Sequence, residues 1–279
     1  MKNKATPARL RAAGAGAALM LLALPAATAA CVDTSRDIVF ANGMFNTLQD
    51  AQLSLIALKQ ALDPALQAGR VGPGPFNYDI AYNQNERAHT QFLEAARQNV
   101  GGTFSLFWRY WANRLAPPPW VQDTARFLAR QANNANYLLD ADLQQHVARY
   151  AASIRAGRQV LVVSHSQGNF YSNEARTRLA ADPTVTVGSY GVVGVATPAA
   201  FVATGGPYTT LADDQIINAV RAVNPFTLPA NTNNPPGTSR DAQNHSFVDA
   251  YMRPATTSRP QIVEQSVAVL GSLQAPQCP

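Results

Sequence analysis

RQVLVVSHSQGN, residues 158–169, joins an apolar run to a small polar turn with Ser166 at its centre. The run Val160–Val163 predicts a buried strand, and a helical pattern follows as far as Ala180. A strand, a sharp turn with a central serine and a helix are typical of a nucleophile elbow. Such an elbow lifts the serine hydroxyl above the sheet and points the helix N-terminus toward it. An ordinary strand-to-helix turn rich in Ser and Gly would have a similar sequence.

Short apolar strands and amphipathic helices alternate along the rest of the chain. We expect further strands at 37–41, 76–82, 189–196 and 208–211, and further helices at 48–62, 86–99, 140–156 and 260–273. This alternation predicts an α/β fold with a mostly parallel central sheet and helices on both faces. In such sheets, functional groups gather at the carboxyl ends of the strands.

The first of these helices has clear signals at both ends. Thr47 and Asp50 have the spacing of a capping box, and Pro64 is expected to end the helix. Its buried stripe is predicted to begin at Leu48 and to reach Leu62 in steps of three and four residues.

The first thirty residues have the pattern of a cleaved export signal. A basic start is followed by a short apolar stretch at 12–24 and by small residues at 25–30. The apolar stretch is too short for a membrane-spanning helix, and no later segment is long and apolar enough for one. We expect residues 1–30 to be removed and residues 31–279 to form a single exported domain, either periplasmic or secreted.

The net charge argues against a nucleic-acid partner. The whole chain carries +5, but four of its positive charges and no acidic residue lie in the leader, which leaves +1 on the mature chain. A basic, nucleic-acid-binding surface needs a larger positive excess than this.

The two cysteines, Cys31 and Cys278, lie at the two ends of the expected mature chain. In an exported protein this placement predicts one disulfide that fastens the termini together. Alternatively, Cys31 is the lipid-modified first residue of a lipoprotein, which would leave Cys278 unpaired. Neither the number nor the spacing of the cysteines supports a zinc site, and no metal is expected.

A serine needs a base to take its proton, and the base needs a third group to hold it in one tautomer. In folds with this elbow the order is Ser, then Asp or Glu, then His. Only His245 follows the elbow, at the end of a long polar loop, so it is the expected base, with an exposed loop histidine as the alternative. We expect His89 and His146 on solvated helix surfaces, and His165 to point away from Ser166.

The acid is expected between the elbow and the histidine. Asp214 is the preferred candidate because an apolar residue follows it two positions on, and Asp213 is the alternative. Capping of a surface helix would also explain both residues. Asp241 and Asp249 flank His245 too closely in sequence to be preferred.

The oxyanion of an acyl-transfer intermediate needs two backbone donors. The N–H of Gln167 is one candidate, because it follows the nucleophile directly. The N–H of Met44, in the loop after the first strand, is the other, and Gly43 would allow the backbone conformation that turns it inward.

The chain resembles the α/β-hydrolase family, and bacterial lipases and esterases in particular, from about residue 36 to the end. Residues 164–169 are similar to their Gly-His-Ser-x-Gly elbow, residues 42–44 to their His-Gly-aliphatic turn, and residues 244–247 to the segment before the last helix of many members. Ser164 and Asn42 replace the usual Gly and His. The resemblance implies acyl transfer to water through a Ser166 ester, with His245 as base and then acid, Asp214 as orienter and no cofactor.

The function predicted from the sequence is therefore an exported serine hydrolase that cleaves carboxylic esters, with a small-molecule or lipid ester as substrate. A phospholipase, a thioesterase, an acyltransferase and a polyester depolymerase share this chemistry. A non-catalytic binding protein on the same scaffold is an alternative of another class. The aromatic segment 101–120 could form a lid or a wall for an acyl chain, or could pack in the core.

Overall fold

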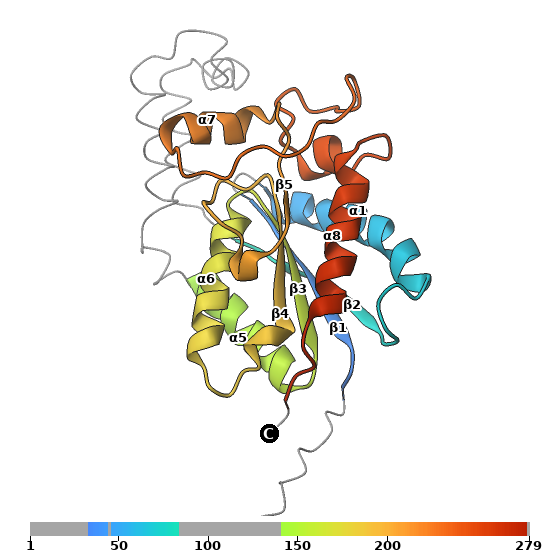
Figure 1. Ribbon diagram of the computed structural model, residues 1–279, viewed down its shortest axis with the longest axis vertical. Coiled ribbons are helices and arrows are strands. Elements are labelled where there is room, and N and C mark those ends of the chain that lie inside the picture. The colour runs from blue at the N-terminus through green and yellow to red at the C-terminus, as the bar shows by residue number, and fades with distance from the viewer. Residues whose placement is uncertain (1–32, 44–45, 84–140, 278–279) are drawn as a thin grey trace, which may run out of the picture.

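A parallel sheet lies at the centre of the protein in the computed structural model, which describes residues 33–43, 46–83 and 141–277 (Figure 1). In this part of the chain, the five strands lie in the order β2-β1-β3-β4-β5, and all neighbouring pairs are parallel. The predicted α/β class is confirmed. The strands are β1 (Arg36–Ala41), β2 (Phe76–Ala81), β3 (Gln159–His165), β4 (Tyr190–Val195) and β5 (Tyr208–Thr209).

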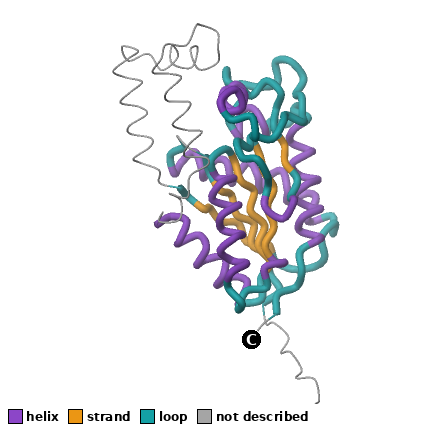
Figure 2. Tube along the Cα trace, turned by 60° about the vertical axis from the view of Figure 1, so that its left-hand side comes forward, coloured by secondary structure: helices purple, strands orange, loops and turns teal. Residues whose placement is uncertain are grey.

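Helices cover both faces of the sheet (Figures 1 and 2). One face packs against α1 (Leu48–Gln67) and α8 (Ser258–Ser272), and the other packs against α5 (Ala141–Arg155) and α6 (Gly168–Ala181). The remaining α-helix of the described residues, α7 (Gln215–Val223), lies beyond the carboxyl ends of the strands.

Alternate residues of each central strand enter different cores. Ile38 and Phe40 of β1 pack in the core beneath α1 and α8, whereas Val39 and Ala41 pack in the core beneath α5 and α6. All four side chains are at most 3% exposed. Because both faces of the strand are buried, its sequence is a continuous apolar run rather than an apolar and polar alternation.

The α1 helix begins as predicted but ends later. Thr47 and Asp50 form the capping box, with each side chain bonded to the backbone N–H of the other residue. Pro64 lies inside the helix, so the prediction that it ends the helix is wrong. A proline there lacks an N–H and clashes with the preceding turn, but Leu66 in the next turn is buried in the core and stabilises the continuation. Leu48 is also misplaced by the prediction, since it is 49% exposed in the first turn.

The strand order reverses between β1 and β3. From β1 the chain crosses to β2 on one side and later returns to β3 on the other. Ligands of open α/β sheets bind at such a reversal. In the register of β1 and β3, Ala41 is the partner of Ser164, so the residues after both strands lie at the same edge.

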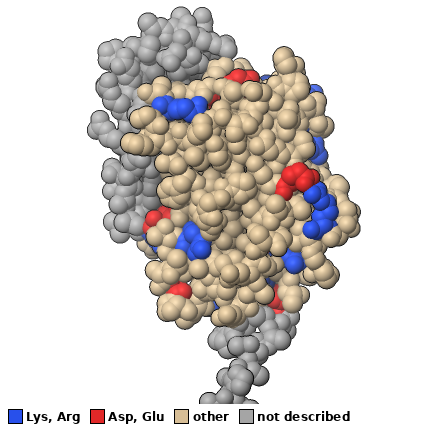
Figure 3. Space-filling model, in the orientation of Figure 1, with Lys and Arg blue, Asp and Glu red and all other residues tan. Residues whose placement is uncertain are grey.

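Several predicted features lie outside the described residues. These are the leader at 1–30, Met44, the helix at 86–99, the aromatic segment at 101–120, and Cys31 and Cys278. In the described residues, no helix has the length and hydrophobicity needed to cross a membrane. On the face shown in Figure 3, the charged side chains of the described residues are scattered among uncharged ones.

Candidate active site

Ser166 lies in a strained turn between β3, which ends at His165, and α6, which begins at Gly168. Its φ of +53° is in the left-handed region, which a residue with a side chain rarely adopts. The Ser166 N–H donates to Val195 O at 3.0 Å, which ties the turn to the end of β4. Strain of this kind typically costs 1–3 kcal/mol and persists only where neighbouring contacts hold it.

Asn169 supplies those contacts. Its Nδ2 donates to Ser166 O at 2.8 Å, to Val195 O at 3.1 Å and to Ser164 O at 3.3 Å. Its Oδ1 accepts from the Ser164 hydroxyl at 3.1 Å. Ser164 is fully buried, and its hydroxyl is bonded to Asn169. A serine is therefore tolerated at this position, where the family that the sequence resembles has glycine.

Two glycines let the backbones around Ser166 approach each other. A Cβ on Gly43 would lie 2.6 Å from Ser166 Cβ, and a Cβ on Gly168 would lie 2.5 Å from Ala41 O. Both distances are far below van der Waals contact. Gly43 does not have a positive φ, and the space that it leaves for Ser166 explains the glycine. Its predicted effect on the Met44 N–H lies outside the described residues.

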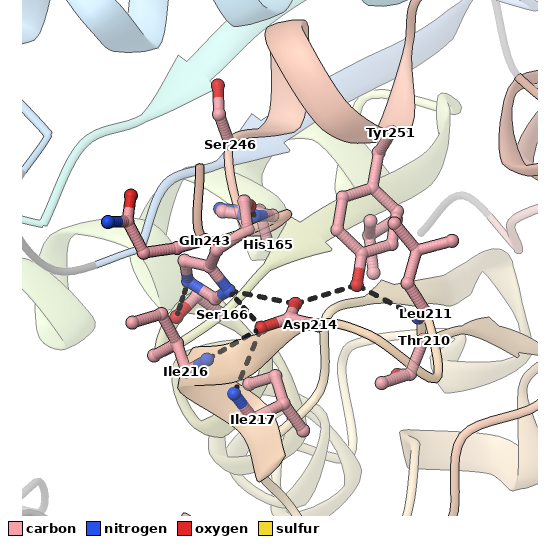
Figure 4. A network of polar contacts seen from close by, with 12 residues as sticks. His165, Ser166, Thr210, Leu211, Asp214, Ile216, Ile217, Gln243, Ser246 and Tyr251 are labelled. Atoms are coloured by element: carbon pink, nitrogen blue, oxygen red, sulfur yellow. Dashed lines mark hydrogen bonds and ion pairs between the residues drawn. The ribbon is translucent and has the colours of Figure 1, made fainter. Parts of the chain in front are cut away.

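His245 connects Ser166 to Asp214, and the labelled Ser166 and Asp214 lie close together in Figure 4. The distance from Ser166 Oγ to His245 Nε2 is 3.1 Å, and His245 Nδ1 lies 2.9 Å from Asp214 Oδ2 and 3.1 Å from Asp214 Oδ1. An ionised carboxylate only accepts hydrogen bonds, so Nδ1 carries the proton of the neutral ring. Nε2 is then the acceptor for the Ser166 hydroxyl. The three predicted side chains are thus in contact, although 79 residues separate the serine from the histidine.

Asp214 both caps α7 and faces His245. Its Oδ1 accepts from the N–H groups of Ile216 and Ile217, at 3.1 and 3.0 Å, and the residue is fully buried. Asp213, the alternative acid, is exposed, and its carboxylate accepts from Asn244 Nδ2 at 2.8 Å. Asp214 therefore caps α7 and contacts His245 at the same time. The structure brings Asp214, rather than Asp213, to His245.

The loop that carries His245 is held by a second carboxylate. Asp241 Oδ2 accepts from the N–H of His245 and from the N–H of Ser246, both at 2.7 Å. Asn244, just before the histidine, has a φ of +53°, which asparagine tolerates better than most residues. Asp241, which was predicted to lie too close in sequence to be the preferred acid, binds the backbone N–H of His245 rather than its imidazole.

No family model, curated protein or solved structure matches this chain. Comparison therefore names no family for it, and its function is inferred from the geometry of these side chains.

His165 contacts His245 rather than the Ser166 hydroxyl, a contact with the site that the sequence did not predict. Its Nε2 lies 2.8 Å from His245 O, and the centroids of the two rings are 4.9 Å apart. Burial, together with the nearby His245, lowers the pKa of His165 to about 3. The ring is therefore neutral near pH 7, and its Nε2–H donates to the carbonyl of His245.

The remaining predicted residues fall into three groups. The N–H of Gln167 lies at the first turn of α6, next to Ser166, where helix N–H groups have no partner within the helix. Met44, the second predicted oxyanion donor, lies outside the described residues, as does His89. His146 is 4% exposed and packs beside Tyr150 and Tyr171, so the prediction of a solvated surface histidine is wrong. The other face of α5 is the solvated one.

Within the described ranges, no three His, Cys, Asp or Glu side chains are grouped as metal ligands would be.

The charges around His245 set the direction of its titration. Burial lowers the pKa of His245, but the charge and hydrogen bond of Asp214, and the charge of Asp241, outweigh burial and raise the pKa above 6.5. As a base, the ring must be neutral, and a raised pKa means that the neutral form is lost at a higher pH on acidification.

For the ester hydrolysis that the sequence predicts, we therefore expect kcat/KM to fall on the acid side with a midpoint above pH 6.5. A pH–rate profile with a p-nitrophenyl ester measures this. In Asp241→Asn, which removes one of the charges that raise the pKa of His245, the midpoint should move to lower pH. A wild-type midpoint at or below that of a free histidine would contradict the electrostatics described above.

Proposed function

We propose that this chain is a serine hydrolase of the α/β-hydrolase type that cleaves carboxylic esters through an acyl-serine intermediate. The observation that carries the proposal is the continuous contact from Ser166 Oγ through the imidazole of His245 to the buried carboxylate of Asp214. The three residues also occur in the order Ser, Asp, His that accompanies this elbow in the α/β-hydrolase fold.

The position of Ser166 in the fold gives independent support. It follows β3 at the point where the strand order reverses, and it faces Gly43 at the end of β1. Reversal points of parallel sheets are where such folds bind their ligands. A residue in a left-handed conformation, held there by Asn169, is also characteristic of a strained functional turn.

The geometry suggests how the reaction would proceed. As Ser166 Oγ attacks the ester carbonyl carbon, His245 Nε2 takes the hydroxyl proton, and the imidazolium formed is stabilised by ionised Asp214. The carbonyl π electrons move to the oxygen, toward which the N–H of Gln167 can donate. When the tetrahedral intermediate collapses, the C–O bond to the alcohol breaks, and the imidazolium protonates the leaving alcohol.

Deacylation would use the same groups in reverse. A water molecule gives a proton to His245 Nε2 while its oxygen attacks the acyl carbon. Collapse of this second intermediate returns the proton to Ser166 Oγ and releases the carboxylic acid. The balance is one ester and one water consumed, and one acid and one alcohol formed.

The export signal and the disulfide expected from the sequence remain proposals that accompany this function. We infer that the enzyme acts outside the cytoplasm, in the periplasm or the medium, where a Cys31–Cys278 bond would be stable. The second oxyanion donor is proposed to be the N–H of Met44.

A fluorophosphonate probe tests the proposed function, because it forms a stable adduct with an activated serine. Purified protein should gain one probe mass, and peptide mapping should place it on the peptide that contains Ser166. The same protein should hydrolyse p-nitrophenyl esters, and the preferred acyl length would distinguish an esterase from a lipase. Heat-denatured protein is the control, since it keeps the serine but not its contact with His245. A folded protein with neither adduct nor hydrolysis would instead support a binding protein on this scaffold.

A further inference from the structure

Tyr251 lies against the face of Asp214 opposite α7. It ends a π-helical turn, Phe247–Tyr251, that begins two residues after His245, and it is fully buried. Its hydroxyl donates to Asp214 Oδ2 at 2.7 Å and accepts from the Leu211 N–H at 3.1 Å. The same Asp214 oxygen lies 2.9 Å from His245 Nδ1. Tyr251 and His245 thus share one carboxylate oxygen, as Figure 4 shows for the labelled Tyr251 and Asp214.

These contacts fix the carboxylate on all sides. The N–H groups of Ile216 and Ile217 hold Oδ1 from the first turn of α7, and the tyrosine hydroxyl holds Oδ2. The Leu211 N–H in turn fixes the tyrosine oxygen. Hydrogen bonds to a charged oxygen are among the strong ones, particularly where water is excluded. Asp214 is therefore prevented from rotating away from the imidazole.

The hydroxyl of Tyr251 remains a donor throughout the working pH range. Burial, and next the charge of Asp214, raise the pKa of Tyr251 well above its ordinary value. A phenol that keeps its proton cannot become a competing anion beside the carboxylate. It also draws negative charge away from the side of Asp214 that faces His245.

We propose that Tyr251 is a positioning residue of the hydrolase, which holds Asp214 toward Nδ1 of His245 and moderates the attraction between them. This inference rests on the proposed function. Tyr251 does not touch Ser166 in the network, so it acts through Asp214 and His245.

The Tyr251→Phe variant tests this role, because it removes one oxygen and keeps the ring. Without the hydroxyl, Asp214 is less well oriented, so kcat should fall about 10-fold, a change typical of losing one hydrogen bond to a charged group, with little change in KM. The carboxylate should also attract the imidazolium more strongly. The acid limb of the pH–rate profile should therefore move to higher pH.

Other titratable groups face the imidazole and must stay constant in this comparison. These are Asp214 before α7, Asp241 in the preceding loop and His165 at the end of β3, while Asp213 acts on Tyr251. Tyr251→Phe alters none of them. A shifted acid limb would therefore report on the Tyr251 hydroxyl itself.

Tyr190→Phe is a matched control. Tyr190 is also buried, at 1% exposure, and its hydroxyl donates to the backbone oxygen of Ser172 at 3.1 Å, away from the network around Asp214. Both variants lose one buried tyrosine hydroxyl, so both should lower the thermal unfolding midpoint. Only Tyr251→Phe should lower kcat and move the acid limb.

A double-mutant cycle separates positioning from a general loss of structure. In an Asp214→Asn background, Tyr251→Phe should cause little further loss of kcat, because the carboxylate that it positions is already absent. Equal losses in the two backgrounds would overturn the proposal, and so would a folded Tyr251→Phe protein with wild-type kcat and pH profile.

A second substitution keeps the proposal testable if Tyr251→Phe does not fold. Site-specific 3-fluorotyrosine at 251 keeps the shape and has a more acidic hydroxyl, which is a stronger donor to Asp214. The acid limb should then move to lower pH, the opposite direction, and an unchanged limb would overturn the proposal. Failure of the proposed function itself is recognised separately, by a Ser166→Ala protein that retains wild-type turnover.

Discussion

Ser166→Ala is expected to abolish labelling by a fluorophosphonate and to lower kcat for ester hydrolysis by about 10⁶-fold. The variant removes the oxygen that is proposed to form the acyl ester, while His245 and Asp214 keep their contacts with each other. Hydrolysis that remains would come from transition-state binding without a covalent intermediate. Stopped-flow traces should also lose the initial burst of p-nitrophenol, since no acyl-enzyme can accumulate.

Ser164→Ala is the matched control for this result. Ser164 is a buried serine of the same turn, but its hydroxyl points into the protein and bonds to Asn169 Oδ1. Its removal should cost stability, about 1 kcal/mol for one buried hydrogen bond, and should leave the probe adduct intact. Wild-type labelling of a folded Ser166→Ala protein would remove this serine from the mechanism and with it the hydrolase proposal.

The fold class can be predicted from the sequence because the central strands are buried on both faces. Runs such as Val160–Val163 have no polar residue to interrupt them, and helical patterns lie between them, which leaves few arrangements other than a parallel sheet. The errors fall where tertiary packing overrides a local signal. Pro64 would end an isolated helix, but burial of Leu66 extends α1 past it.

The residues of the candidate site could be predicted from the sequence only in part. The elbow is a local signal, and the order of Ser, Asp and His follows from the fold that the elbow suggests. The supporting residues have no such signal. His165 touches the backbone of His245 across 80 positions, and Tyr251 meets Asp214 across 37. From the sequence, a tyrosine in an apolar segment is predicted to be a core residue. Its hydrogen bond to Asp214 can be identified only in the folded structure.

Asp241 shows the same limit at short range. Asp241 lies only four residues before His245, and this closeness in sequence disfavours it as the acid. Its carboxylate instead binds the N–H groups of His245 and Ser246. Aspartate bonds of this kind to a following backbone N–H are common in turns, so the spacing could have indicated a loop anchor.

Asp214→Asn is expected to lower kcat by about 10⁴-fold with little change in KM. The asparagine oxygen can still accept from the N–H groups of Ile216 and Ile217, so the cap of α7 and the fold are retained. Its amide nitrogen, however, can donate to His245 Nδ1, which moves the ring proton to Nε2. A protonated Nε2 cannot accept the proton of Ser166, and the base is held in the wrong tautomer. Steady-state kinetics, with circular dichroism to verify folding, measure this effect.

Asp213→Asn provides the comparison at the adjacent position. Asp213 is exposed and binds the Asn244 side chain rather than an imidazole nitrogen, so its variant should lose no more than a few-fold in kcat. The difference between the two variants measures how far the buried carboxylate, rather than negative charge in this loop generally, fixes the tautomer of His245. Inactivation by Asp213→Asn with activity retained in Asp214→Asn would assign the acid to the exposed residue, and the network of Asp214, Tyr251 and α7 would then serve the fold alone.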